Sequence, residues 1–328
     1  FGTTRNPWNI DYMPGGSSGG GTASLAAGLA TLATGTDTFG SIRLPAAMCG
    51  VYGLKPSYGL VSAYGITPSA WSLDTAGPMA RSVSDLALML YYMAGFDLKD
   101  PASLNVRVPN YMENLNKGIR GVKIGVPTYY LKGLDRDVEK LFQQAIVTLK
   151  YLGAEIKEIV VPELNMSTFS GYATVTSEAS TFHFEWLRNY PAYYSPDIRA
   201  FFLAGALSHT PQYVRAQQAR RKMVEAVERS FEKVDILLGP TIPITIPAYR
   251  EDWIEQNLEV VRRCLPFTAP INLTGIPSLA VPMGLDQRGL PVGMQFIGNH
   301  LSEKLLLQVG SAWESTDPLR VTLASINS

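Results

Sequence analysis

Two serines in glycine-rich loops are the residues near the start of this sequence with the types and spacing to do chemistry. Residues 15–21 read Gly-Gly-Ser-Ser-Gly-Gly-Gly and include Ser17, and a second loop of small residues over 35–45 includes Ser41. Glycine serves where a backbone takes positive φ or approaches another group closely, and successive free N–H groups form concavities that bind anions. A helix-like run over 22–29 and a strand-like run over 31–34 separate the loops. Both loops could therefore lie at one site.

The first loop also permits three other interpretations. Residues 16–20 match the Gly-x-Ser-x-Gly string of a nucleophile elbow, with Ser18 at its centre. That elbow follows a strand and needs a histidine base, whereas residues 9–14 are not strand-like and the histidines stand in unmarked surroundings: His183, His209 and His300. A phosphate-binding loop would place a lysine after the glycines, and a flexible linker would not usually run directly into an alanine-rich helix. All three interpretations are therefore disfavoured.

The residues around both loops resemble the amidase signature family. The similar segments are residues 14–21, 35–49, 50–56, 72–79, 235–241 and 267–297. The resemblance covers nearly the whole chain. It implies an α/β fold whose mixed, largely central β-sheet is covered by helices on both faces. It also implies a single amidase-signature domain over residues 1–328 and an amidohydrolase that cleaves a carboxamide C–N bond.

The resemblance further implies a Ser-Ser-Lys triad. Ser41 matches the nucleophile, and Ser17, 41 − 17 = 24 positions earlier, matches the bridging serine that follows a cis peptide bond, here Gly16–Ser17. The expected oxyanion hole consists of the backbone N–H groups of Thr38, Phe39, Gly40 and Ser41. Loop support is expected from Gly16, Ser18, Asp37 and Arg43, and Trp71 is the expected wall of the substrate pocket. No metal or organic cofactor is implied.

The physical logic of this triad is a proton relay. A serine hydroxyl is a poor nucleophile until a base takes its proton, and an amine leaves poorly unless an acid protonates it. Ser17 would accept the proton of Ser41 while giving its own to a neutral lysine, and would then return a proton to the departing amine. The lysine must be uncharged to serve, so its site must disfavour the ammonium form.

The sequence departs from the family's pattern in two ways. Phe39 stands where the common phrase has glycine, so either a positive φ strains its backbone or its ring narrows the acyl pocket, and we favour the second interpretation. The base lysine should lie well before Ser17, yet none of the sixteen preceding residues is lysine. Lys55 belongs to a separate block of the family and is not its base. We therefore expect the lysine on an N-terminal segment outside this sequence, and expect this chain alone to be inactive.

Three functions remain open on the sequence. The leading hypothesis is a stand-alone amidase that forms an acyl-serine intermediate. The second is the glutaminase subunit of a tRNA-dependent amidotransferase, which passes ammonia to a ligase partner. The third is an inactive family member that acts as a binding module. Residues 70–79 and 166–206 resemble general amidases more closely, which favours the first.

Composition excludes several other classes. The chain has 28 Lys plus Arg and 28 Asp plus Glu, so its net charge is zero, whereas a grip on nucleic acid needs a basic excess. The basic cluster Arg215, Arg220, Arg221 and Lys222 is expected on a solvated helix face. Two cysteines without metal-ligand spacing exclude a disulfide framework and a zinc knuckle. No apolar run reaches the roughly 18–20 residues of a membrane span. We expect a soluble, cytoplasmic protein with a small-molecule amide substrate, and a homo-oligomer stays open.

Hydrophobic periodicity predicts the elements that position the loops. Apolar residues recur at steps of three and four over 135–153, between strand-like segments over 122–126 and 154–161. Ser82 and Asp85 form a capping-box pattern before a helix over 86–93. Further predicted elements are a helix over 211–231, strands over 234–238, 278–281 and 291–297, and a last helix that starts at 302. Alternating strands and helices favour an α/β fold with a mixed sheet.

Overall fold

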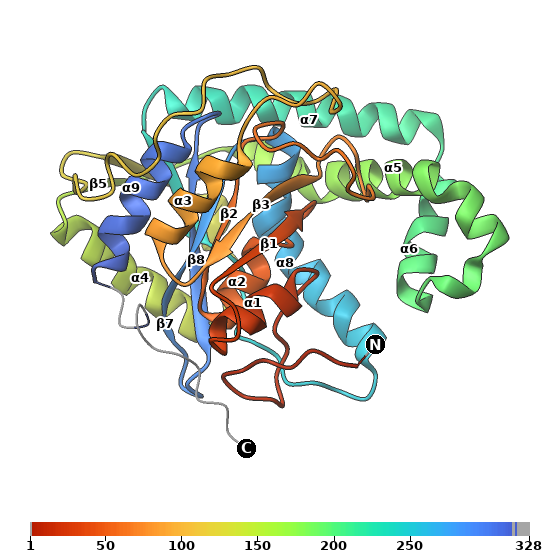
Figure 1. Ribbon diagram of the computed structural model, residues 1–328, viewed down its shortest axis with the longest axis horizontal. Coiled ribbons are helices and arrows are strands. Elements are labelled where there is room, and N and C mark those ends of the chain that lie inside the picture. Colours follow the sequence, from red (N-terminus) through yellow and green to blue (C-terminus); the bar gives the residue numbers. More distant parts are fainter. Residues whose placement is uncertain (1, 317–318, 320–328) are drawn as a thin grey trace.

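The chain folds around one eight-stranded mixed sheet (Figure 1). The computed structural model describes residues 2–316 and 319. The strands lie in the order β1-β3-β2-β7-β8-β6-β4-β5. The β6-β4-β5 edge is parallel and the other neighbours are antiparallel. The strands are β1 (Leu32–Asp37), β2 (Tyr52–Lys55), β3 (Thr75–Ala80), β4 (Lys123–Pro127), β5 (Glu155–Ile159), β6 (Ile236–Pro240), β7 (Ser278–Leu285) and β8 (Pro291–Gly298).

Helices cover both faces of the sheet, as expected from the sequence. Side chains alternate along a strand, so Ile236 and Leu238 join the core of one face and Leu237 joins that of the other. The first face carries α3 (Val83–Met93), α4 (Arg136–Tyr151) and α9 (Glu303–Glu314). The second carries α1 (Gly19–Ala26), α2 (Arg43–Cys49), α5 (Ser167–Asn189), α7 (Thr210–Phe231) and α8 (Trp253–Thr274). Short 3-10 turns cover Thr128–Leu131, Pro162–Met166 and Pro191–Tyr193.

The predicted periodic elements are confirmed, and the helix and strand between the glycine-rich loops differ in their boundaries. The helix predicted over 135–153 is α4, and the Ser82 side chain accepts the backbone N–H of Asp85 at the start of α3. The helix predicted over 22–29 is α1, which begins three residues earlier, at Gly19, and ends at Ala26. The strand predicted over 31–34 is β1, which continues to Asp37. Glycine disfavours a helix interior only moderately, and packing of α1 against α2 and β1 overrides that preference.

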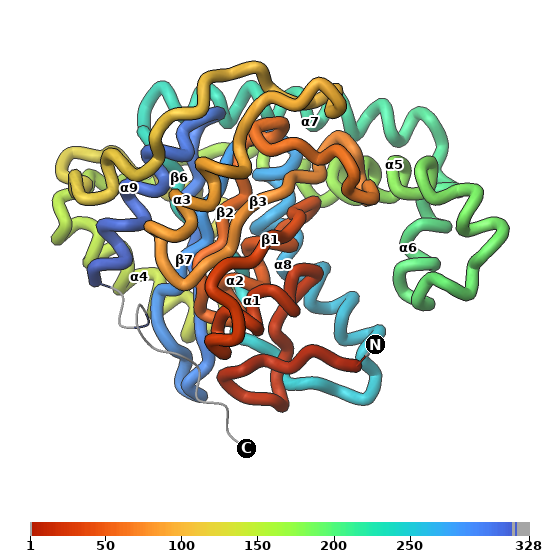
Figure 2. The backbone as a smooth tube through the Cα atoms, viewed as in Figure 1, coloured from red at the N-terminus to blue at the C-terminus, as the bar shows by residue number. Residues whose placement is uncertain are grey.

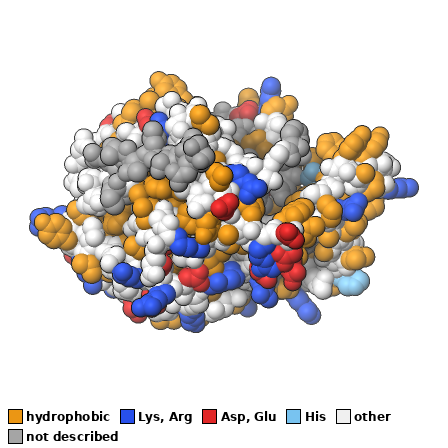
Figure 3. Space-filling model, turned by 90° about the horizontal axis from the view of Figure 1, so that it is seen from below, with side chains coloured by type: hydrophobic (Ala, Val, Ile, Leu, Met, Phe, Trp, Pro, Cys, Tyr) orange, Lys and Arg blue, Asp and Glu red, His pale blue; other side chains and the backbone are white. Residues whose placement is uncertain are grey.

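A pair of helices projects from the body of the molecule (Figure 2). The outer part of α5 and α6 (Pro196–Ala206) enclose a small core of Ala179, Leu187 and Phe202. Large side chains remain exposed on this part: Phe182, Phe184, Trp186, Tyr190, Tyr193, Ile198, Leu203 and Leu207. Figure 3 shows hydrophobic side chains at the end of the molecule from which these helices project. Among the described residues, no helix is both long and apolar enough to cross a membrane.

Gly205 fixes the contact between α5 and α6, because a Cβ at this position would overlap the carbonyl oxygen of Thr176. We expect Gly205→Ala to force the helices apart and to lower the free energy of unfolding by about 1–3 kcal/mol. Thermal or urea unfolding checks this, with Ala204→Ser on the exposed side of the same helix as the control. Equal stability of both variants and the parent chain would contradict it.

Candidate active site

The two serine-containing loops meet at one place in the fold. The backbone N–H of Ser18 donates to the carbonyl of Ser41 at 3.2 Å, so the segment that contains Ser17 lies directly beside Ser41. The Gly16–Ser17 peptide bond is cis, as the resemblance implied. Ser17 is exposed and Ser41 is half-buried. The two serine residues therefore lie in one region, at the end of the sheet where β1 leads into α2.

Glycines make this meeting sterically possible. A Cβ on Gly35 would lie 2.6 Å from the Oγ of Ser18, so any larger residue would push the first loop away from β1. Gly40 has φ +114 and a Cβ on it would lie 2.7 Å from the side chain of Thr268. Only glycine adopts that backbone conformation readily, so the turn before Ser41 depends on it.

A buried ion pair organises the loop before Ser41. Asp37 and Arg43 have no exposed surface, and the Nε of Arg43 donates to Asp37 at 3.0 Å. Asp37 also accepts the backbone N–H groups of Gly40 at 2.7 Å and Ile42 at 3.3 Å. Burial alone would raise the pKa of Asp37, but the charge and hydrogen bonds of Arg43, with a hydrogen bond from Asn272, lower it to about 2. The geometry agrees with the loop-support role predicted for Asp37 and Arg43.

Residues far along the chain complete this network, and the sequence analysis did not single them out. Arg43 donates to Asn272 on α8 at 2.7 Å and to Gln295 on β8 at 3.0 Å. Asn272 donates to the carboxylate of Asp37 at 2.8 Å, and Thr268 donates to the carbonyl of Phe39. The sequence does carry a signal: Gln295 stands alone among apolar neighbours and Asn272 stands between Ile271 and Leu273, and a buried polar group needs a partner.

The orientation of the loop corrects one expected oxyanion donor. The N–H of Gly40 points to Asp37 and is therefore already bonded. Thr38, Phe39 and Ser41 remain as the expected donors. Phe39 is not among the described non-glycine residues with positive φ, which removes the strained alternative. Its ring packs toward α5, where a Cβ on Gly171 would lie 3.0 Å from it.

Lys55 lies within the sheet and does not contact the serine loops in any hydrogen bond of the described residues. Its side chain is fully buried, and its Nζ donates to the carbonyl of Pro56 at 2.8 Å. Burial lowers the pKa of Lys55 to about 7; the nearby charges of Asp37 and Glu303 raise it and that of Arg43 lowers it. That Lys55 is not the catalytic base stays a prediction from the sequence.

The histidines also lie outside the serine site. His183 bonds the carbonyl of Pro68 through Nε2 at 2.9 Å and the hydroxyl of Tyr194 through Nδ1 at 2.9 Å. His209 precedes α7 and bonds the side chain of Gln212 through its backbone N–H, and His300 is exposed. Among the described residues, no hydrogen bond joins a histidine to either serine loop.

Trp71 lies on the loop that precedes β3, and its side chain is 64% exposed. The same loop is bonded by Arg220, a residue whose predicted position was wrong. Arg220, expected on a solvated face, instead points inward and donates to the Ser72 hydroxyl and carbonyl at 3.0 Å each. Arg221 behaves as expected, because it pairs with Glu225 at 2.7 Å on the exposed face of α7.

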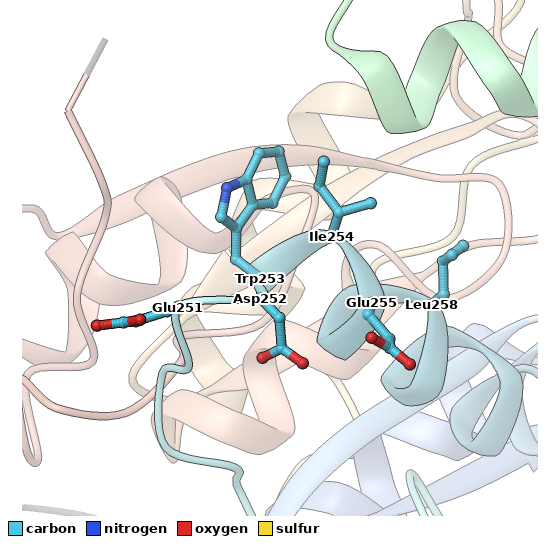
Figure 4. Close-up of a pocket in the computed structure, with 6 residues that line it drawn as sticks. All are labelled: Glu251, Asp252, Trp253, Ile254, Glu255 and Leu258. Atoms are coloured by element: carbon cyan, nitrogen blue, oxygen red, sulfur yellow. The ribbon is translucent and has the colours of Figure 1, made fainter.

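A surface hollow of about 320 Å³ lies at the start of α8 (Figure 4). It is lined by Glu251, Asp252, Trp253, Ile254, Glu255 and Leu258. At 1.5 Å per helical residue, its Trp253 lies roughly 22 Å along α8 from Thr268, so the hollow is separate from the serine site. The described residues contain no group of three or more His, Cys, Asp or Glu that could hold a metal ion.

Comparison with known proteins identifies the class. The family model for amidases matches residues 1–307. A glutamyl-tRNA(Gln) amidotransferase subunit of Alkalilimnicola ehrlichii is 40% identical over 342 residues, which cover 96% of this chain and 69% of that protein. The corresponding subunit of Thermotoga maritima has a TM-score of 0.89 at 32% identity, with 100% of this chain and 72% of that chain covered. A bacterial aryl acylamidase, described as an amidase signature enzyme, has a TM-score of 0.88 at 26% identity, with 100% and 71% covered.

Fold, site and these matches together define a hydrolase that acts on amide bonds. The chain belongs to the amidase signature family and has its α/β fold.

The buried Lys55 makes stability depend on pH in a specific direction. Its folded pKa of about 7 lies below the ordinary 10.5, so between these values folding releases a proton and stability rises with pH. We expect the free energy of unfolding of the parent chain to rise relative to Lys55→Met by up to about 1.4 kcal/mol per pH unit from pH 7 to 10. Urea unfolding at each pH measures this.

Lys123→Met, at an exposed lysine that begins β4, is the control and should run parallel to the parent. A Lys55→Met curve that also runs parallel would show that Lys55 is not held with a depressed pKa.

Proposed function

We propose that this protein hydrolyses a carboxamide through an acyl intermediate on Ser41. The observation that carries the proposal is the meeting of the two loops, in which the N–H of Ser18 bonds the carbonyl of Ser41. Ser17 precedes that contact by one residue, which brings the residue proposed to relay the proton next to the proposed nucleophile. We assign residues 1–328 to a single amidase-signature domain.

In the proposed reaction, Ser41 attacks the carbonyl carbon while Ser17 accepts its proton and passes its own to a lysine outside this sequence. The N–H groups of Thr38, Phe39 and Ser41 hold the oxyanion, and each such donor is typically worth about 2.7–4 kcal/mol. Ser17 then protonates the leaving amine, and water hydrolyses the acyl-serine by the same relay in reverse. Asp37 and Arg43 act by fixing the loop.

The proposed substrate is a small-molecule amide. Its acyl group would lie beside Phe39, and Trp71 would form part of the wall of the pocket that binds it. The ring of Phe39 lies between the oxyanion loop and Gly171 of α5, so it would narrow the space for the acyl group. A cytoplasmic location stays a prediction from the sequence.

A second candidate function is the glutaminase step of a tRNA-dependent amidotransferase. It is favoured by the identity of 40% to the glutamyl-tRNA(Gln) amidotransferase subunit of Alkalilimnicola ehrlichii. In that case the amide is glutamine, and the ammonia passes to a ligase partner. The resemblance of residues 70–79 and 166–206 to general amidases favours the stand-alone enzyme.

The nucleophile assignment predicts a complete loss of turnover in Ser41→Ala and a loss of at least about 100-fold in Ser17→Ala, because a missing general base typically costs 10²–10⁴-fold. Ammonia release from a panel of aliphatic, aromatic and peptide amides measures this on the product of the complete reading frame that encodes these residues. Ser24→Ala, a half-buried serine on α1 whose hydroxyl bonds the carbonyl of Gly21, is the control. Retained turnover in Ser41→Ala would refute the assignment.

The proposed external lysine predicts that the purified 328-residue chain releases no ammonia. If this chain cleaved amides at a rate abolished by Ser41→Ala, the base would have to lie within it. Its circular dichroism spectrum should match that of a folded α/β protein, which separates missing chemistry from misfolding.

The two candidate functions predict different preferences for glutamine. A stand-alone amidase should hydrolyse its best simple amide far faster than glutamine and purify without a second protein. A glutaminase subunit should prefer glutamine and co-purify with a ligase partner when expressed from its native host. Kinetics on both substrates and mass spectrometry of the purified material distinguish them.

A further inference from the structure

The sheet places Thr38 opposite Asp74 at the edge of the active site. β1 and β3 pair in antiparallel register up to Asp37 and Thr75. Thr38 and Asp74 occupy the next position of this ladder, where the strands have ended. Their side chains join there instead, because the hydroxyl of Thr38 donates to the Oδ1 of Asp74. The oxyanion loop thus receives a side-chain anchor at its first residue.

Asp74 is itself held firmly. It is only 9% exposed, and its Oδ2 accepts the backbone N–H groups of Ser69 at 2.8 Å and Ala70 at 3.0 Å. Both carboxylate oxygens are therefore bonded, one to the loop over residues 67–74 and one to Thr38. Moving Asp74 would break three hydrogen bonds at once.

The loop over residues 67–74, which we call the strap, is fixed to two long helices. On α5, Glu178 accepts the N–H of Ser72 at 3.0 Å and its hydroxyl at 2.7 Å. On α7, Arg220 bonds the same residue and also the carbonyl of Leu273 at the end of α8. Glu178 is buried and also accepts the hydroxyl of Tyr213. The strap is thus held in place on both helices, and Asp74, its last residue, is held with it.

We propose that Asp74 is a positioning residue for the reaction, which holds the oxyanion loop in its productive orientation by fixing Thr38 to the strap. The proposal rests on the proposed function of Ser41. Asp37 fixes the loop from the core side through Gly40 and Ile42, whereas Asp74 fixes the opposite, half-buried side. Thr38 and Phe39 lie between the two carboxylates, and their N–H groups are the expected oxyanion donors.

Misplacing a donor that acts only when charge develops in the transition state lowers kcat and leaves KM nearly unchanged. We therefore expect Asp74→Asn and Thr38→Val each to lower kcat about 10- to 100-fold, the size of loss typical of a small displacement of catalytic groups. Because both substitutions remove the same hydrogen bond, the one between Thr38 and Asp74, the double variant should be no slower than the slower single variant. Thr38→Ser keeps the hydroxyl and should therefore retain most of the parent kcat.

The test uses the product of the complete reading frame and its fastest small amide substrate, with active sites titrated so that partial misfolding does not count as slow chemistry. Asp97→Asn and Ser62→Ala are the matched controls. Asp97 likewise accepts a hydroxyl, from Ser62 at 2.8 Å, and a backbone N–H, from Lys99 at 2.9 Å, but outside the active site. These controls should leave kcat and KM unchanged.

Hydrogen exchange gives a readout that does not depend on turnover. Asp74→Asn and Thr38→Val should accelerate exchange of the amides of residues 38–41 at least tenfold, and the two controls should not. Unchanged exchange there, a kcat of Thr38→Val equal to that of the parent, or kcat losses that multiply in the double variant would each overturn the proposal. Ser41→Ala is measured alongside: retained turnover in it would refute the proposed function, whereas its loss with a normal Thr38→Val would refute only the role of Asp74.

Discussion

The buried ion pair between Asp37 and Arg43 is the interaction on which the active site depends. Neither charge reaches solvent, and removing one partner of such a pair leaves an uncompensated charge that costs roughly 3–5 kcal/mol. The carboxylate is bonded to the backbone of the loop, and the guanidinium to α8 and β8. The loop before Ser41 is therefore oriented by charges in the protein core, and Asp74 adds a second anchor on the open side.

Much of this architecture follows from the sequence, because its causes are local. Periodicity at three and four residues defines α4, and alternating strands and helices require a layered α/β fold. The glycines of both loops and their serines point to one site, since small residues permit the close approach seen between Gly35 and Ser18. The expected support by Asp37 and Arg43 also follows from their positions on either side of the turn.

Other features could not be predicted, because they depend on long-range packing. The direction of the Gly40 N–H is set by a glycine conformation that sequence does not specify, so this group was expected to bind an oxyanion and instead bonds Asp37. Arg220 carries the same charge as its neighbour Arg221, yet one lies against Ser72 and the other in solvent. Only the meeting of α7 with the strap decides between them.

The distances along the chain between these partners have a consequence for folding. Arg43 bonds Gln295, which lies 252 positions away, and Asn272, which lies 229 positions away. Contacts of such high separation are costly to form, since much loop entropy must be lost before they are made. A ribosome-bound chain that has emerged only as far as β1 and α2 carries both serines but lacks the partners of the guanidinium. Ser41 therefore acquires its final surroundings only after β8 has been synthesised, so a nascent chain exposes the serine loops without the support that orients them.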